Sequence, residues 1–314
     1  MFFTTRPTFA PARRRAAGFC GACAVAGLVM LSASATASAG ASAAESPALL
    51  TLLEGPATLI VGARTHLAAP GARLPAGTLI ETEADTALLR LEWPDGSALD
   101  LGPSTRVMLR PGAASGGKAP LFYLLRGWAK QTQSTTAGGQ LSQAFDVAPF
   151  KGVLVSQVDD GRVVLFCEAG DAPLVARRSD STAVLRAGQS AVVVGAGAAQ
   201  VTQRPASDWL KQLPRSFRET LPSRAAQLAK LPSVPLQPGP VLTYARLQHW
   251  LSAEPLLRRD MPARFRGLLA DRSFRSAVDA RLNQHPEWEP LLRPPSTGAA
   301  ARKNNDTSVT EPTR

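Results

Sequence analysis

The chain has 314 residues, of which 45% are hydrophobic and 19% are charged. This hydrophobic fraction supports a real core in one large or two ordinary domains. The formal net charge is +11, and three cysteines are too few to specify a disulfide framework.

The first 39 residues have the pattern of a secretory signal peptide. Arg6 and the run 13–15 give a positive start, and residues 16–44 carry no charge. The apolar part covers 16 residues, short of the roughly 20 that a spanning helix needs, and Ala37-Ser38-Ala39 fits a cleavage site. We expect a periplasmic or secreted protein cleaved near Ala39, with an uncleaved N-terminal membrane anchor as the alternative. Export leaves no transmembrane span after cleavage and argues against nucleic acid as a partner.

Residues 48–203 have the pattern of successive short β-strands. Turn pairs such as Asp95-Gly96 and Asp160-Gly161 recur about every 8–12 residues, with alternating apolar and polar residues between them. This spacing predicts an all-β roll or sandwich of short hairpins. The clearest predicted strands are residues 57–61, 86–91, 97–101, 106–109, 152–158, 162–166 and 191–194. Cys167 is expected to be a small buried hydrophobe, and the Gly/Ser-rich residues 112–118 an exposed loop.

The sequence changes character at Pro205. Prolines punctuate residues 204–294, and helices are predicted at 242–251 and 272–283, where apolar residues recur on one helical face. This stretch holds 15 basic and 8 acidic residues, a net charge of +7. We therefore expect a smaller basic α-helical region after the β domain, followed by a disordered tail at 295–314.

The sequence has no clear catalytic or metal-binding pattern. Its three histidines lack further ligands at zinc-site spacing. Residues 188–192 lack the second glycine of a nucleophile elbow, and residues 191–200 lack the third small residue and the helix of a dinucleotide site. Asp159-Asp160-Gly161 is predicted to form a hairpin turn, while Glu81 and Glu83 are expected to share a solvated strand face. We therefore expect no enzyme activity, no cofactor and no metal.

Aromatic and basic residues supply the candidate contacts for a ligand or partner. Tryptophan packs in cores by default, but an exposed ring can also stack on a sugar face. Trp128 lies between Arg126 and Lys130 in the run LLRGWAKQT, so it is the first candidate for an exposed aromatic contact. Arg258 and Arg259 are the candidates in the basic region.

Several segments of the β region carry a family resemblance. They are EGPA at 54–57, LPAGTLIET at 74–82, ALLRL at 87–91, PDGSALDL at 94–101, STRVML at 104–109 and LRG at 125–127. In this order they resemble the FecR domain, named for the periplasmic half of a bacterial iron-transport signalling protein. Strands between residues 152 and 194 look like the later half of that domain. The resemblance covers roughly half of the chain and implies a FecR-like all-β fold.

The FecR resemblance implies binding rather than catalysis. The family's signalling members resemble anti-sigma regulators, with a cytoplasmic N-terminal helical segment and a mid-chain transmembrane helix, and this sequence contains neither pattern. The first hypothesis is an exported envelope protein with a sensing or scaffolding domain. Its partner would be a periplasmic or membrane protein, bound through strand edges or the basic helices. The alternative is binding of peptidoglycan or polysaccharide through exposed aromatics and the basic C-terminal region.

Overall fold

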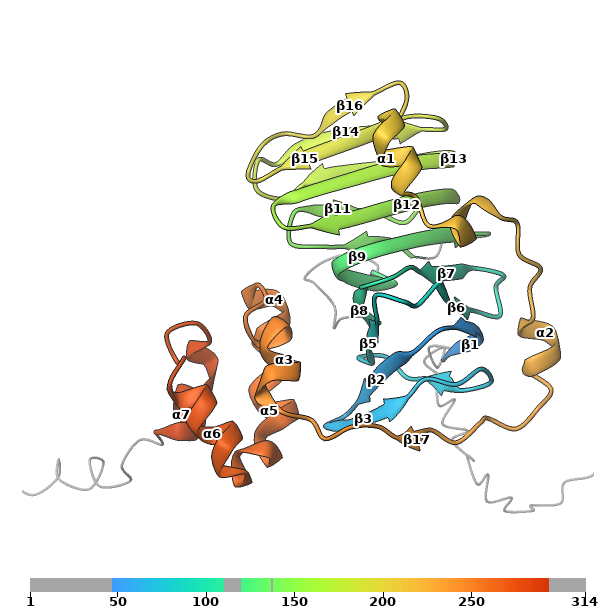
Figure 1. Ribbon diagram of the computed structural model, residues 1–314. Coiled ribbons are helices and arrows are strands. Elements are labelled where there is room, and N and C mark those ends of the chain that lie inside the picture. The colour runs from blue at the N-terminus through green and yellow to red at the C-terminus, as the bar shows by residue number, and fades with distance from the viewer. Residues whose placement is uncertain (1–46, 110–119, 137, 294–314) are drawn as a thin grey trace, which may run out of the picture. The chain divides into compact units, whose positions relative to one another are not determined.

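The computed structural model describes residues 47–109, 120–136 and 138–293. Within these ranges the chain is mainly β, with 17 strands, and short helices follow the main run of strands (Figure 1). The predicted fold class is therefore confirmed. The predicted signal peptide, the loop at 112–118 and the tail at 295–314 lie outside the described residues.

The strands agree with the predicted ones most closely where the alternation is regular. They are β1 Ala48–Glu54, β2 Ala57–Val61, β3 Arg64–Leu67, β4 Arg73–Leu74, β5 Leu79–Thr82, β6 Leu88–Glu92, β7 Ala98–Leu101, β8 Arg106–Leu109, β9 Phe122–Gln133, β10 Gln140–Leu141, β11 Phe145–Val147, β12 Gly152–Asp159, β13 Arg162–Ala176, β14 Ser181–Arg186, β15 Ser190–Val194, β16 Gln200–Thr202 and β17 Gln237–Pro238. The strands predicted at 57–61 and 106–109 coincide with β2 and β8. By contrast, β13 continues to Ala176, well beyond the predicted end at residue 166.

The strands form two sheets that together make a sandwich. The order in the first sheet is β4-β1-β6-β7-β9-β12-β13-β15-β16. The order in the second sheet is β17-β3-β2-β5-β8-β9-β10-β11-β13-β14. Every pair is antiparallel except β9 with β10, which is parallel.

Two long strands belong to both sheets and join them. The first half of β9 pairs with β8 and β10, and its second half pairs with β7 and β12. Likewise, β13 pairs first with β12 and β15 and then with β11 and β14. A glycine with positive φ lies at each change of sheet, Gly127 at +96° and Gly170 at +81°. A Cβ at either position would press against a neighbouring segment, so glycine permits the bend.

Two hydrophobic clusters fill the space between the sheets. The first includes Leu50, Leu89 and Leu99 of the first sheet with Leu59, Ile80 and Phe122 of the second. The other includes Leu154, Leu165 and Cys167 of the first sheet with Phe145, Leu174 and Leu185 of the second. Cys167 is fully buried, as predicted. Each cluster draws on both sheets, so the alternation in the sequence corresponds to an inner and an outer face of each sheet.

The segment after β16, residues 204–243, runs along the sandwich, and we call it the strap. Its first part, α1 (Ser207–Gln212) and η1 (Arg215–Arg218), packs on the outer face of the first sheet. After α2 (Ala225–Leu228), the strap follows the edge at β4. There Arg73 donates to the carbonyls of Ala229 and Leu231, at 3.0 and 3.1 Å. Finally β17 pairs with β3.

The remaining helices pack on the outer face of the second sheet. They are α3 Tyr244–Leu251, α4 Pro255–Arg258, α5 Met261–Phe265, η2 Arg266–Ala270, α6 Arg272–Asp279, η3 Pro286–Trp288 and α7 Glu289–Leu292. Their apolar residues share one cluster with Ile60, Leu79 and Tyr123 of the sheet. The helices predicted at 242–251 and 272–283 correspond to α3 and α6, although α6 ends at Asp279. Within the described ranges, no helix is both long and apolar enough to cross a membrane.

Candidate functional site

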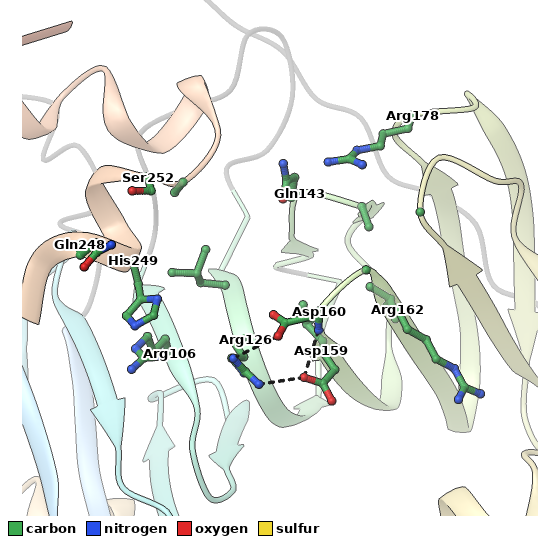
Figure 2. A pocket seen from close by; sticks show the side chains of 17 residues that line it. Arg106, Arg126, Gln143, Asp159, Asp160, Arg162, Arg178, Gln248, His249 and Ser252 are labelled. Atoms are coloured by element: carbon green, nitrogen blue, oxygen red, sulfur yellow. Dashed lines mark hydrogen bonds and ion pairs between the residues drawn. The ribbon is translucent and has the colours of Figure 1, made fainter. Parts of the chain in front are cut away.

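A cleft of about 320 Å³ lies where the β12–β13 hairpin approaches α3. Strands β8 and β9 contribute to its wall, as do the residues after β10 and after β13. Figure 2 shows charged and polar side chains from all of these elements around one opening. The charged or ionisable ones are Arg106, Arg126, Asp159, Asp160, Arg162, Arg178 and His249. The apolar part of the lining includes Leu125, Val158 and Val163.

The hairpin that forms one side of the cleft follows from its turn residues. Asp159 pairs with Arg162 across the strands, so Asp160 and Gly161 form the two-residue turn that the sequence predicts. Gly161 has a φ of +74°, which suits glycine. Arg126 of β9 reaches both acidic side chains, with Nη2 at 3.1 Å from Asp159 Oδ1 and Nη1 at 3.6 Å from Asp160 Oδ2. Both carboxylates are therefore ion-paired with Arg126 at the surface.

Two polar contacts and an apolar face hold α3 beside the cleft. The buried Trp250 donates its Nε1–H to Glu81 Oε1 at 2.8 Å, and Glu81 also lies 3.5 Å from Arg106 Nε. Immediately after α3, Glu254 accepts hydrogen bonds from Tyr123 Oη at 2.7 Å and from Arg177 Nη1 at 2.5 Å. These contacts connect α3 and α4 to both halves of the sandwich.

The environment of Glu81 differs from the one that the sequence predicts. The alternation with Glu83 predicted a shared solvated face, but Glu81 is half-buried between Arg106 and Trp250. Trp250 comes from the helical region, far from Glu81 in the sequence. The local alternation of polar residues therefore could not predict that Trp250 covers Glu81. Glu83 is exposed, as expected.

His249 lies on the cleft side of α3, and its pKa is lowered from the ordinary histidine value, which favours the neutral imidazole. Partial burial lowers its pKa, and the charges of Arg106 and Arg126 lower the pKa further. Glu81 and Asp160 oppose the shift without reversing it. Ser252 also lines the cleft, but no hydrogen bond joins it to His249 among the residues that the structure describes. The cleft therefore offers several polar groups that could bind a ligand.

The structure places Trp128 inside the molecule, which corrects the expectation of an exposed aromatic contact. Its side chain is 9% exposed and packs against Trp209 of α1, with ring centroids 5.5 Å apart. The other tryptophans are buried as well: Trp93, Trp209, Trp250 and Trp288. None of the five tryptophan rings can stack on a sugar without a rearrangement.

The basic candidates have different environments. Lys130 donates to the carbonyl of Phe217 at 2.6 Å and pairs with Glu168 at 2.7 Å, so it fastens the strap to the sheet. Arg258 is likewise committed to a structural contact, with Glu287 at 2.7 Å. Arg259 is exposed, and its nearest acid is Asp260 at 3.9 Å. Of the five candidate contacts, only Arg126 lies in the cleft.

The cleft contains residues that the sequence analysis missed, above all Arg178, Gln143 and Gln248. Each lies near a turn or on a helix and belongs to no recognisable motif. Their association depends on the pairing of β13 with β11 and on the packing of α3, which are both long-range contacts. No local signal in the sequence could have grouped them.

A second exposed feature is the end of the sandwich formed by β14 and β16. Among the described residues, β14 pairs only with β13, and β16 pairs only with β15. Several apolar side chains here face solvent, including Val184 at 54% exposed, Val194 at 60% and Val201 at 41%. The opposite end differs, because β4 and β17 are two-residue strands and the strap runs along β4.

Within the described ranges, no group of three or more His, Cys, Asp or Glu residues is arranged to hold a metal ion. No protein-family model matches the sequence, and no curated protein matches it either. Among solved structures, similarity is found to two crystal structures of a candidate anti-sigma factor from Parabacteroides distasonis. Both have a TM-score of 0.36, with 14% and 13% sequence identity. Each alignment covers 43% of this chain and 63% or 64% of that protein, so the chain matches less than two thirds of that protein's length.

Proposed function

We propose that this chain is an exported, FecR-like binding protein of the bacterial envelope, and that it acts by binding a protein partner rather than by catalysis. The segments between residues 54 and 127 that resemble the FecR domain support this proposal. The mainly β sandwich is consistent with it. Export is proposed from the signal-like pattern of residues 1–39.

The observation that carries the proposal is the open edge at β14. This strand has six residues, and its outer face carries Val184 beside Pro173 of β13, with Thr182 beside Val175. Natural proteins usually protect an edge strand with lysine, proline, a bulge or a covering segment. The sequence of β14, STAVLR, contains neither lysine nor proline, and its one charged residue, Arg186, stands at its last position. Among the described residues no strand pairs with the outer side of β14, although the Arg186 N–H donates to Gln189 Oε1. An extended segment of a partner protein can therefore pair along this side and pack on its apolar side chains.

The contrast between the two ends of the sandwich supports β14 as the binding edge. At the other end, β17 contains Pro238, which has no N–H to donate. The strap holds β4, where Arg73 N–H donates to Ser233 Oγ at 3.3 Å. In the part of the chain that the structure describes, the protected edges are thus at one end of the sandwich, and the six-residue β14 at the other end has no covering segment.

Site-specific photo-crosslinking in the intact bacterium tests the proposal. A photoreactive residue at Thr182 should give one discrete protein adduct, whereas the same residue at Val241 of the strap, which is 79% exposed, should not. The captured protein, purified, should bind the purified chain. Val184→Lys should weaken that binding at least tenfold, and Val241→Lys should leave it unchanged. Equal adducts at both positions, or binding indifferent to Val184→Lys, would contradict the proposal.

A further inference from the structure

We infer that the cleft beside the β12–β13 hairpin binds a small carboxylate-bearing ligand, with the Arg178 guanidinium as its main charged contact. Arg178 belongs to the turn between β13 and β14, so the site adjoins one end of the β14 edge. The inference does not depend on the proposed partner. Four features of the cleft carry the inference: uncommitted donors, an apolar lining, a small positive charge and a suitable size.

The cleft contains polar groups that the fold itself does not use. Arg178 forms no ion pair or hydrogen bond with any other residue that the structure describes, although it follows directly after Arg177, which is fully engaged with Glu254. The side chains of Gln143, Gln248 and Ser252 also have no partner among the described residues. Figure 2 shows the Arg178 side chain extending toward Gln143 at the mouth of the cleft. Several hydrogen-bond donors around one opening, none engaged by another described residue, are suited to a ligand with several acceptors.

The apolar part of the cleft gives such a ligand a surface to pack on. Leu125, Val158 and Val163 line it together with the polar groups. A volume of about 320 Å³ is at the lower end of the roughly 300–1,000 Å³ that is usual for small-molecule sites. The ligand is therefore small, or is the end group of a longer molecule.

The charge of the cleft favours a monoanion. Arg106, Arg126, Arg162 and Arg178 line it with two acids, Asp159 and Asp160, giving a net charge of +2 with neutral His249. This sum already counts both acids, which pair with Arg126. Arg106 pairs with Glu81, and Arg162 extends away from the other labelled side chains, so Arg178 is the positive charge left for a ligand. Asp160 is 88% exposed, so it would repel a phosphate dianion more strongly than a carboxylate. A guanidinium also accepts a carboxylate through two parallel hydrogen bonds.

The uncharged polar side chains of the cleft indicate which groups of the ligand lie beside its carboxylate. Gln143 and Gln248 each offer an amide that both donates and accepts, and Ser252 offers a hydroxyl. These groups fit the amides of a short peptide and the hydroxyls of an acidic sugar equally well. Both kinds of ligand present a carboxylate next to neutral hydrogen-bonding groups. The experiment below distinguishes a short peptide from an acidic sugar.

Titration calorimetry with the purified chain tests the inference with two probes, the dipeptide Ala-Glu and galacturonic acid. We expect one of them to bind with a stoichiometry of one. The form of that probe in which every carboxylate is replaced by a carboxamide should bind at least tenfold more weakly. The probe that binds identifies the source. Inorganic phosphate should bind more weakly than the better carboxylate probe. If neither carboxylate probe binds, or if the amide binds equally well, the inference is wrong.

Two arginines provide a matched pair of variants. Arg178 and Arg162 are both exposed and unpaired among the described residues, but the Arg162 side chain extends away from the other labelled side chains of the cleft (Figure 2). Arg178→Ala should reduce the affinity at least tenfold, and Arg162→Ala less than twofold. Asp160→Asn should increase the affinity, because it removes a repelling charge. Equal losses for the two arginine variants would indicate general electrostatic attraction and would overturn the inference. Arg178 lies close to Thr182 along the chain, so the independence of the two proposals is tested with Asp160→Asn, which lies in the β12–β13 turn. Crosslinking at Thr182 should be unaffected by Asp160→Asn, so the two proposals fail independently.

Discussion

Arg90 and Asp100 face each other across β6 and β7 and form a buried two-point ion pair. The Arg90 Nε lies 2.6 Å from Asp100 Oδ1, and Nη2 lies 2.7 Å from Oδ2. Their side chains are only 10% and 2% exposed. The remaining nitrogen, Nη1, donates to the carbonyl of Leu221 at 3.1 Å. The pair therefore lies on the outer face of the first sheet and also fixes the path of the strap over it.

We expect Asp100→Ala to destabilise the protein by about 3–5 kcal/mol, because it leaves the Arg90 charge buried without its partner. Urea denaturation followed by circular dichroism measures this change. Replacing both residues by apolar ones, Arg90→Met with Asp100→Leu, should cost much less. A matched control is Asp208→Ala, which breaks the exposed pair with Lys211 and should cost less than about 1 kcal/mol. Equal effects of the two single variants would show that the Arg90–Asp100 pair is not structurally important.

Gly127 is predicted to be much less tolerant of substitution than Gly161, although both have positive φ. A Cβ at Gly161 would meet nothing within 4 Å, whereas at Gly127 it would collide with Ser104 and Thr105. Gly161→Ala should therefore cost about 1–2 kcal/mol, from backbone strain alone. Gly127→Ala should cost roughly 3 kcal/mol or more, because steric crowding is added to the strain. Denaturant midpoints of the two variants measure the difference, and a smaller effect at Gly127 would contradict the bend assigned to β9.

The features that the sequence predicts well are local ones. The turn at Asp160-Gly161 and the strands β2 and β8 depend on alternation and turn residues within a few positions. The burial of Cys167 follows from the same alternation. Strand β9 shows the limit of this reasoning. Its bend at Gly127 depends on which strands flank each half, and alternation within β9 does not specify its neighbours.

The candidate site was less predictable because it depends on contacts between distant segments. Trp128 has basic neighbours in the sequence, yet Trp209 covers it in the structure. The sequence suggests Arg126 as a contact residue because it is close to Trp128 in the chain. In the structure Arg126 lies in the cleft because it pairs with the acids of the β12–β13 hairpin. Arg178 and His249 reach the same cleft only through sheet pairing and helix packing. Sequence reasoning thus identified basic residues without grouping the ones that lie together.

The contact of Trp209 with Trp128 is predicted to hold the first part of the strap on the sheet. Trp209 is 5% exposed and donates its Nε1–H to Gln157 Oε1 at 2.6 Å. Trp209→Ala should cost about 3–5 kcal/mol of local stability, as is usual for a buried tryptophan. Limited proteolysis should then cut residues 204–218 while the sandwich remains intact. Leu210→Ala is the control, because Leu210 is 38% exposed on the same helix. Equal protease resistance of the Trp209 variant and the unmodified protein would disprove this role.

His285 is predicted to make the protein less stable in mildly acidic solution. It is fully buried beside Tyr244, and burial lowers its pKa, while Glu287 and the Val278 backbone oppose the shift only in part. The unfolded state, with an ordinary histidine pKa of about 6.5, therefore binds the proton first as the pH falls. Stability should begin to fall near that pH, and the loss is complete below the pKa of the folded state.

Thermal melts between pH 7.5 and pH 5 measure this effect through His285→Phe, a variant that retains an aromatic ring next to Tyr244. The melting temperature of the unmodified protein should fall more steeply with decreasing pH than that of the variant. His249→Gln is the control, since His249 lies at the exposed cleft and its pKa is also lowered; its replacement should flatten the profile less, because solvent reaches the ring. Parallel pH profiles for His285→Phe and the unmodified protein would show that protonation of this buried imidazole does not limit stability in acid.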